Sequence, residues 1–273
     1  MALDWGIGGL PFFQALGAAL PGADLLYLSD SGSVPYGKQS SGELYRRLEE
    51  IAALSAALGT GTLAVACNAM SSVLSVPCSI LGGVEVFSLV HTFIASPLPS
   101  GRVIGLIGGV RTINSGIYQK ALEGVGNRVR SRPTQELSAL IEAGDFDAAP
   151  AFLEKTLSAL GNIDALVLAC THYPAVSALI KKRAPDLEII DPGAVLLDTC
   201  LRRLSGAGPD RGAGQGQNRE PGLPGPEKTG GRRIYLTTGG AEQSRRAAER
   251  AFGFSCLPFV KIGVDLNPAD ARA

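Results

Sequence analysis

Two cysteines in the chain follow short apolar runs of the same design. Residues 63–66 lead into Cys67 and residues 166–169 lead into Cys170, and a polar residue comes next in both cases. In an open α/β sheet, ligands bind in the crevice outside the carboxyl ends of the strands. The repeat therefore predicts two thiols that face one another across one cleft, a geometry suited to moving a proton from one face of a carbon to the other.

The composition favours a globular enzyme with a small ligand. The chain has 273 residues, 45% of them hydrophobic, which is enough for two modest α/β domains. Lys plus Arg and Asp plus Glu number 25 each, so the net charge gives no reason to expect nucleic acid or a membrane surface as partner. We expect a small-molecule substrate, and the composition leaves a homodimer open.

The cysteines and the start of the sequence indicate a cytoplasmic protein. The five cysteines are an odd number without the spacing of a zinc site or a disulfide framework, which favours a reducing compartment and no metal. Asp4 and the glycines after it interrupt the apolar start, so no signal peptide is predicted. The sequence also lacks an uninterrupted apolar run long enough for a membrane span.

Short apolar runs alternate with helical patterns along the chain, which predicts βαβ units with a mostly parallel sheet. Helix 42–58 is the clearest, since Leu44, Leu48 and Ile51 share one face and charged residues surround them. The predicted strands are 23–28, 63–66, 103–107, 165–169, 187–190 and 233–236. The other predicted helices are 117–126, 134–143, 148–160, 174–183 and 241–252.

The pattern divides the chain into two α/β domains and an insertion. We expect residues 1–95 plus 232–273 to form the first domain and residues 96–204 the second. Residues 205–231 are dominated by Gly, Pro and charged or amide side chains, so they bury too little surface to offset the entropy of ordering. That segment is predicted to be a mobile surface insertion.

Several motifs resemble the glutamate racemases of the aspartate/glutamate racemase superfamily, in both order and spacing. The run Cys-Thr-His-Tyr-Pro after an apolar strand, with Cys-Asn about a hundred residues earlier, is the specific part of the signal. The resemblance covers nearly the whole chain except the insertion. The residues that carry it are 4–10, Asp30 with 34–37, 66–68, Thr112 with Ser115 and Tyr118, 170–174 and 237–239.

The resemblance implies a fold, an activity and a place in metabolism. It implies two pseudo-symmetric α/β domains with mostly parallel sheets and the active site in the cleft between them. It also implies an isomerase that interconverts L- and D-glutamate without a cofactor and supplies D-glutamate for peptidoglycan synthesis. Such a racemase needs one group to remove the α-proton and a second group on the opposite face to return one. One cysteine must then be a thiolate while the other is a thiol.

Residue roles follow from the resemblance position by position. Cys67 would be the base toward the D-enantiomer, with Asp4 beside it. Cys170 would be the base toward the L-enantiomer, with His172 and Glu142 beside it. The substrate would be held by the family's binding positions, which here are Asp4, Trp5, Tyr36, Gly37, Asn68, Ala69, Thr171 and His172. Helix N-termini after both cysteines would favour the substrate carboxylates, and Gly6, Gly8 and Gly9 would let the first loop approach the ligand closely.

Each assignment has a structural alternative. A cysteine after a buried strand is usually a small core residue, and only the duplicated context argues otherwise here. Cys78, Cys200 and Cys256 lack that context and are expected to be core or surface thiols. His91 lies in an apolar stretch and is expected to be structural, and a solvated helix end would explain Glu142 equally well.

The chain departs from the family at three positions near the site. Trp5 stands where the family usually has serine, Ala69 where it usually has threonine, and Gly109 where threonine is common. The loss of a hydrogen-bond donor to a buried ligand group costs about 1–3 kcal/mol. Glutamate is the leading substrate because the overall resemblance is to the glutamate racemases. Two alternatives remain: aspartate, because Trp5 would fill the space of a methylene, or a non-catalytic paralogue that binds a ligand or a protein, which the loss of the two hydroxyls favours.

Overall fold

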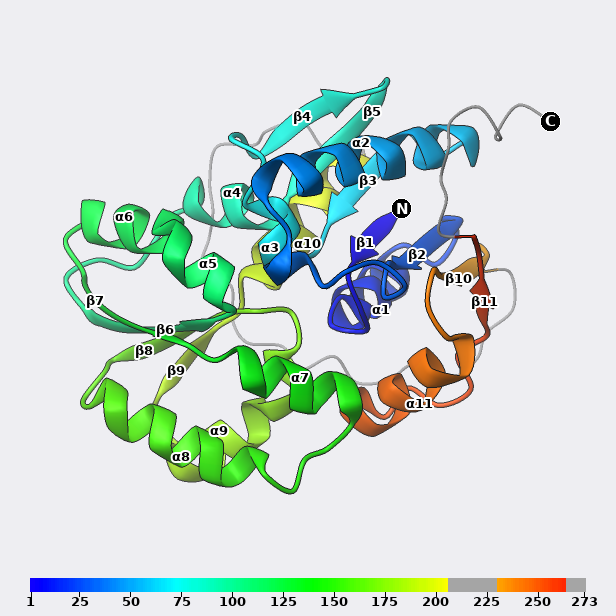
Figure 1. Ribbon diagram of the computed structural model, residues 1–273. Coiled ribbons are helices and arrows are strands. Elements are labelled where there is room, and N and C mark those ends of the chain that lie inside the picture. The colour runs from blue at the N-terminus through cyan, green and yellow to red at the C-terminus, as the bar shows by residue number, and fades with distance from the viewer. Residues whose placement is uncertain (206–229, 264–273) are drawn as a thin grey trace.

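Two β-sheets lie side by side in the computed structural model, which describes residues 1–205 and 230–263 (Figure 1). The larger sheet has seven strands and the smaller sheet has four. The predicted fold class, two α/β domains with mostly parallel sheets, is confirmed. Most of the predicted insertion at 205–231 lies outside the described residues, and the exact domain boundaries stay a prediction.

The larger sheet is built from the two ends of the chain. Its strand order is β11-β10-β2-β1-β3-β5-β4, and every neighbouring pair is parallel except β4 with β5. The short strand β1 lies in the centre, so its carboxyl end opens toward the middle of the molecule (Figure 1). The strands are β1 (Ala2–Asp4), β2 (Leu25–Ser29), β3 (Thr62–Val65), β4 (Cys78–Leu81), β5 (Val84–Ser88), β10 (Arg233–Thr237) and β11 (Phe259–Lys261).

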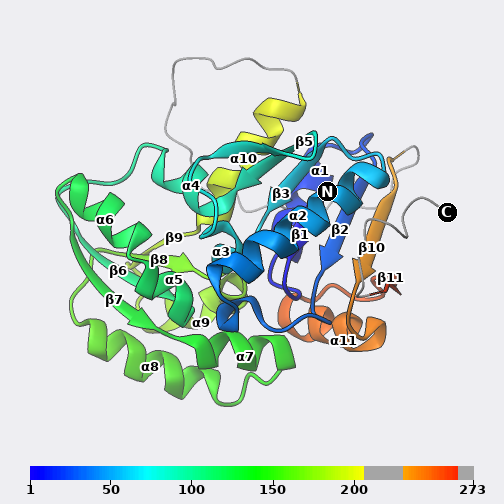
Figure 2. The same cartoon turned by 45° about the horizontal axis from the view of Figure 1, so that its top comes forward.

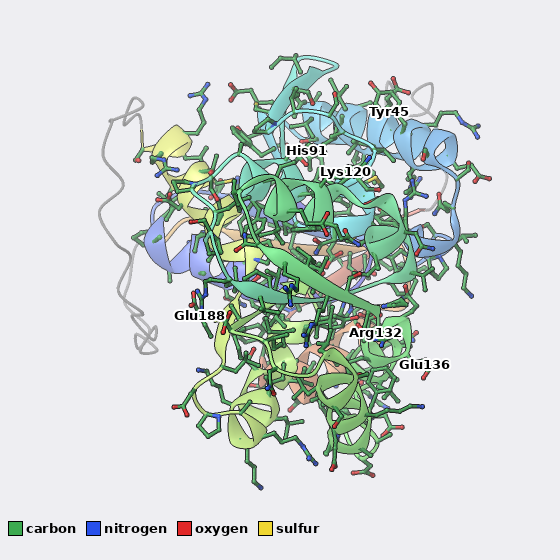
Figure 3. All side chains as sticks on the ribbon, turned by 90° about the vertical axis from the view of Figure 1, so that its left-hand side faces the viewer. Tyr45, His91, Lys120, Arg132, Glu136 and Glu188 are labelled. Carbon is green, nitrogen blue, oxygen red and sulfur yellow. The ribbon has the colours of Figure 1, made fainter. Side chains whose placement is uncertain are left out.

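The smaller sheet is parallel throughout, in the order β7-β6-β8-β9. The central strand β8 is fully buried, as a near-continuous apolar run in a parallel sheet should be. Charged side chains cover the outside of this unit, where Figure 3 shows Lys120, Arg132, Glu136 and Glu188. The strands are β6 (Val103–Gly108), β7 (Arg128–Pro133), β8 (Ala165–Ala169) and β9 (Glu188–Ile190).

Helices connect and cover the strands. The long helix α2 starts at a capping box in which Ser40 and Glu43 exchange hydrogen bonds, an arrangement that stabilises a helix start by about 1 kcal/mol. The helices are α1 (Leu10–Ala19), α2 (Ser41–Ala57), α3 (Asn68–Ser71), α4 (Leu89–Ile94), α5 (Val110–Ser115), α6 (Ile117–Gly124), α7 (Gln135–Ala143), α8 (Ala149–Leu160), α9 (Ser177–Arg183), α10 (Pro192–Leu204) and α11 (Ala241–Phe252), with 3-10 turns η1 (Tyr36–Lys38) and η2 (Tyr173–Val176).

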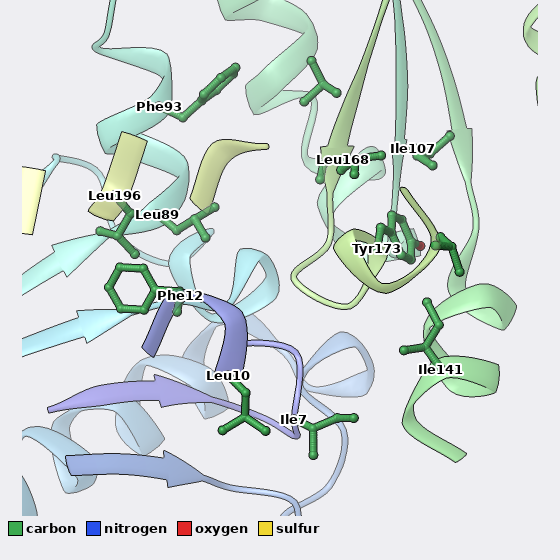
Figure 4. Close-up of a cluster of buried hydrophobic side chains, with 14 of the residues drawn as sticks. Ile7, Leu10, Phe12, Leu89, Phe93, Ile107, Ile141, Leu168, Tyr173 and Leu196 are labelled. Atoms are coloured by element: carbon green, nitrogen blue, oxygen red, sulfur yellow. The ribbon is translucent and has the colours of Figure 1, made fainter. Parts of the chain in front are cut away.

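The hydrophobic core joins the two sheets. We call the larger sheet with its helices the first unit and the smaller sheet with its helices the second unit. One cluster of buried side chains includes Ile7 and Leu10 from the first unit and Ile107, Ile141 and Leu168 from the second (Figure 4). Helix α10 strengthens the connection, because it follows the smaller sheet in sequence but packs against α1 and α4 (Figure 2). The carboxyl ends of β1, β3, β6 and β8 are therefore held around one central space.

The predicted elements are all present, most with boundaries that differ by one or two residues, and one of them is divided. Helix 174–183 is in fact the 3-10 turn η2 followed by α9, which begins only at Ser177. Pro174 lies in the first turn, where it supplies no backbone N–H to hydrogen bonding. The expected helix N-terminus after Cys67 is that of α3, which has four residues, and the one after Cys170 is that of the 3-10 turn η2.

Candidate active site

A pocket of about 390 Å³ lies between the two sheets at the carboxyl ends of their strands. A larger cavity of about 700 Å³ at the amino ends of the seven-stranded sheet is lined mainly by apolar side chains, so the chemistry belongs to the smaller pocket. Every site residue expected from the sequence lines that pocket. They are Asp4, Trp5, Tyr36, Gly37, Cys67, Asn68, Ala69, Glu142, Cys170, Thr171 and His172.

Asp4 links the two sheets at the base of the pocket. Its carboxylate accepts hydrogen bonds from the backbone N–H of Trp5 at 2.7 Å and from the Thr171 hydroxyl at 2.8 Å. Asp4 is 1% exposed, and burial raises its pKa despite the opposing effects of His172, Cys67 and these donors. A buried carboxylate with raised proton affinity beside a thiol can accept the proton of that thiol.

Cys67 lies beyond the end of β3 and beside Asp4. Burial raises the pKa of the Cys67 thiol well above its ordinary value, and the negative charge of Asp4 raises it further. Cys67 is therefore a neutral thiol at neutral pH. A thiol in this position can donate a proton, and Asp4 is the neighbouring group that can accept one.

Cys170 has a different set of neighbours. Its sulfur lies 3.7 Å from Nδ1 of His172, and Nε2 of His172 lies 2.5 Å from Oε2 of Glu142. Burial acts to lower the pKa of His172, but hydrogen bonds to Cys170 and Glu142 outweigh it and hold that pKa well above its usual range. The imidazole is therefore a cation at neutral pH, and it places a positive charge beside the sulfur of Cys170.

Glycines allow the first loop to lie against the relay, the hydrogen-bonded series Cys170, His172 and Glu142. A Cβ at Gly8 would lie 2.6 Å from the Thr171 hydroxyl and 2.7 Å from Nδ1 of His172, and one at Gly6 would collide with the Glu142 carboxylate. The expected close approach is thus made to side chains of the second unit. Glu142 also accepts a hydrogen bond from the backbone N–H of Ile7 at 3.1 Å. Its carboxylate is therefore hydrogen-bonded within the pocket and does not lie at a solvated helix end.

The wall of the pocket near β2 depends on a buried ion pair. Tyr36 is buried, and its hydroxyl donates to Asp30 at 2.7 Å, so the hydroxyl points away from the pocket. Asp30 also accepts from Arg47 at 2.6 Å and from the Thr238 hydroxyl at 2.9 Å. This network fixes the turn that carries Gly37 into the pocket wall.

The amide of Asn68 is oriented by a residue of the other unit. The Tyr118 hydroxyl donates to Oδ1 of Asn68 at 2.6 Å, and both side chains are buried. This contact fixes which end of the amide accepts. The amide nitrogen of Asn68 is a double donor for which the described residues show no acceptor, so it can bind a carboxylate in the pocket.

Trp5 and Ala69 change the character of the pocket where the family usually has hydroxyls. The indole Nε1 of Trp5 donates to the backbone oxygen of Ser33 at 3.1 Å, so its polar group is used within the protein. The remaining indole surface and the Ala69 methyl group line the pocket. This part of the wall is therefore apolar.

Further pocket residues were missed from the sequence. Lys38, Arg111, Gln135, Ser138 and Gln243 also line it. Arg111 and Gln135 follow β6 and β7 closely, so the rule that ligands bind beyond strand ends would have indicated both had it been applied to every strand. Gln243 comes from α11, near the other end of the chain, and no local signal indicates it.

The remaining candidate groups have structural settings. Cys78 and Cys256 are exposed, Cys200 is buried, and none of the three lines this pocket. Ser88 caps the start of α4 by accepting a hydrogen bond from the backbone N–H of His91, and its hydroxyl lies 2.8 Å from Nδ1 of the same histidine. In residues 1–205 and 230–263, no three His, Cys, Asp or Glu side chains gather as metal ligands would. No helix in those residues is long and apolar enough to cross a bilayer.

Comparison with known proteins places this site in a family. The profile of the Asp/Glu/hydantoin racemases matches residues 12–200. The chain belongs to that family. A glutamate racemase of Persephonella marina is 34% identical over 198 residues, which are 69% of this chain and 75% of the relative. A glutamate racemase of Bacillus cereus is 31% identical over 212 residues, 74% of this chain and 77% of the relative.

A solved structure has the same fold. The glutamate racemase of Thermus thermophilus in complex with β-chloro-D-alanine matches with a TM-score of 0.74 and 27% identity, over 97% of each chain. The family predicted from the sequence motifs is thereby confirmed.

We expect Glu142→Gln to lower the pH at which His172 loses its charge. The hydrogen bond that His172 donates to the Glu142 carboxylate helps to raise the pKa of His172, so the cation is present below that raised pKa and is lost as the pH rises through it. The amide of the variant weakens this hydrogen bond and so lowers the pKa of His172. The imidazole then begins to lose its positive charge closer to neutral pH. Titration of the imidazole by NMR measures the pKa of His172 directly, because the chain has only two histidines and therefore only two imidazoles to assign.

Glu136→Gln is the matched control, because Glu136 lies exposed on the same helix α7 and outside the pocket. It should leave the titration of His172 unchanged. Equal titration curves in the wild-type and Glu142→Gln proteins would contradict the assigned relay.

Proposed function

We propose that this chain interconverts L- and D-glutamate by proton transfer between Cys67 and Cys170, without a cofactor. The observation that supports this most strongly is the pair of cysteines in one pocket, each beside its own acid–base partner. Asp4 serves Cys67, and His172 with Glu142 serves Cys170. Two different partners suit two thiols that must hold opposite protonation states at one time.

The L-to-D direction starts with Cys170 as a thiolate and Cys67 as a thiol. The Cys170 thiolate removes the α-proton of L-glutamate, and the C–H electron pair remains on the α-carbon as a carbanion-like intermediate. The Cys67 thiol then donates its proton to the opposite face, which forms the new C–H bond and leaves Cys67 as a thiolate. In the D-to-L direction Asp4 first accepts the Cys67 proton, and Cys170 takes a proton from the His172 cation. The Cys67 thiolate then removes the α-proton of D-glutamate, and the Cys170 thiol donates its proton to the opposite face.

Donors around the pocket would hold the substrate and stabilise the intermediate. The amide nitrogen of Asn68 is available to a carboxylate, and the hydroxyl of Thr171 already orients Asp4. The negative charge of Asp4 suits the substrate ammonium group. Preorganised groups of this kind stabilise developing charge without the cost of reorganising water.

Aspartate is the second candidate substrate, and Trp5 is the observation that favours it. The indole occupies pocket wall where a smaller residue would leave room for a longer substrate side chain. The proposal further places the enzyme in the cytoplasm as a supplier of D-glutamate for peptidoglycan synthesis. A homodimer belongs to the proposal as well, since the described surface carries exposed apolar side chains such as Ile80 and Val260.

Purified protein incubated in deuterated water with each enantiomer of glutamate and aspartate tests the activity. Because a thiol exchanges its proton with solvent, we expect deuterium at Cα of the product without added pyridoxal phosphate or metal. Ser at Cys67 or at Cys170 should abolish racemisation, since each removes one of the two proton carriers.

Cys78→Ser and Cys256→Ser serve as controls, because both thiols are exposed and lie outside the pocket. These variants should keep most of the activity. A folded Cys170→Ala protein with full racemase activity would refute the two-cysteine reaction. Absence of Cα exchange with all four amino acids would instead support the non-catalytic, ligand-binding alternative.

The double variant Trp5→Ser/Ala69→Thr tests which substrate the pocket prefers. It returns two hydroxyl groups and removes the indole, so we expect kcat/KM for glutamate relative to aspartate to rise about tenfold, equivalent to about 1.4 kcal/mol. Trp5→Phe keeps the bulk, loses only the hydrogen bond to Ser33 and should leave the ratio unchanged. A fall in glutamate activity in the double variant would show that the indole contributes to glutamate binding.

A further inference from the structure

Arg111 joins the two sides of the pocket at its mouth. It is the second residue of α5, directly beyond β6 of the smaller sheet. Its Nε donates to the Ser72 hydroxyl at 3.1 Å, Nη1 to the backbone oxygen of Gln39 at 2.8 Å, and Nη2 to the Ser41 hydroxyl at 2.8 Å. All three acceptors belong to the larger-sheet unit.

The three acceptors lie on the segments that carry the Cys67 side of the pocket. Ser72 ends α3, the short helix that Cys67 begins. Gln39 ends the turn η1, which includes Gly37, and Ser41 starts α2. One guanidinium group from the unit that carries Cys170 therefore binds three separate elements of the opposite wall.

Gln135 reaches across the same opening. A Cβ at Gly109 would lie 2.9 Å from Oε1 of Gln135, and one at Gly37 would lie 3.3 Å from it. The amide oxygen thus lies between a glycine of each unit. At the base of the pocket the Thr171–Asp4 and Tyr118–Asn68 hydrogen bonds already join the units. Arg111 supplies the corresponding connection at the mouth.

We propose that Arg111 is a positioning residue that fixes the separation of the walls carrying Cys67 and Cys170, an inference that rests on the proposed racemase function. Proton transfer from two faces requires both sulfurs close to one carbon, and a displacement of about 1 Å can cost a hundredfold in rate. The planar guanidinium holds its donors in fixed directions, whereas a lysine offers one point charge. Arginine is therefore the side chain that can bind three acceptors on three elements at once.

Arg111→Met tests the role by two readouts. We expect kcat to fall at least tenfold and KM to change less than threefold, because the spacing of the walls affects the reaction more than it affects binding. In deuterated water, the ratio of Cα exchange in recovered substrate to racemisation should rise. A proton returned by the same cysteine gives exchange with retention, and a wider gap slows delivery from the opposite face.

Amide hydrogen exchange tests the geometry without reference to activity. Exchange in residues 36–43 and 68–74 should speed up in Arg111→Met, because these segments lose their connection to α5. Arg111→Lys should restore at most part of the protection. Arg203→Met is the matched control, since Arg203 joins α10 to Glu85 on the surface and does not line the pocket. It should leave both readouts at wild-type values.

Ser41→Ala/Ser72→Ala removes two of the acceptors with little change in volume, and it decides the question if Arg111→Met does not fold. It should reproduce the exchange effects in milder form. A raised KM with unchanged kcat and an unchanged exchange ratio would make Arg111 a substrate-binding residue and overturn the proposal. Unchanged amide exchange in both variants would overturn it too. A wild-type protein without racemase activity would refute the proposed function. Amide exchange would still show whether Arg111 connects the two walls of the pocket.

Discussion

The hydrogen bond from the Thr171 hydroxyl to the buried carboxylate of Asp4 is the contact on which the site depends. It joins the end of β1 to the loop after β8, so it holds the carboxyl ends of two separate sheets together. The bond can form only because Gly6 and Gly8 let the first loop lie against Glu142 and His172. A buried carboxylate is costly without donors, and Thr171 and the Trp5 backbone supply them.

The same arrangement gives the two cysteines opposite electrostatic settings. Cys67 lies beside the anionic group Asp4 in a fully buried position, which raises the pKa of Cys67 and favours the thiol. Cys170 lies beside the imidazole of His172, whose raised pKa keeps it cationic. A pocket with similar strand ends on both sides thus has different charges beside its two cysteines, which suits the proposed reaction, in which one thiol donates while the other accepts.

Local patterns predicted the parts of the structure that local physics decides. The apolar runs before Cys67 and Cys170 formed buried strands, and the residues beyond those strands line the pocket. Strand β7 was missed because arginines occupy every second position, which is unlike a buried parallel strand. The hairpin of β4 and β5 was also missed, because its antiparallel edge does not follow the βαβ alternation.

The contacts that complete the site depend on residues far apart in sequence. Arg111 binds Gln39 and Ser41 about seventy positions away, and the packing of the two units brings them together. The direction of the Trp5 indole likewise depends on a carbonyl group in the loop at Ser33. Sequence patterns give no signal for such pairs, since a side-chain hydrogen bond between units has no periodicity.

The most direct test of the central claim is the progress curve of racemisation in deuterated water. Each reaction starts from one enantiomer with ordinary hydrogen at Cα, and circular dichroism records its course. Two cysteines acting on opposite faces return a deuteron from solvent, so the product carries deuterium and reacts back more slowly than the starting material reacts forward. The account predicts that the signal overshoots zero before it settles, with one deuterium at Cα. A curve that approaches zero without overshoot, with equal deuterium in recovered substrate and product, would show a single group serving both faces and would contradict it.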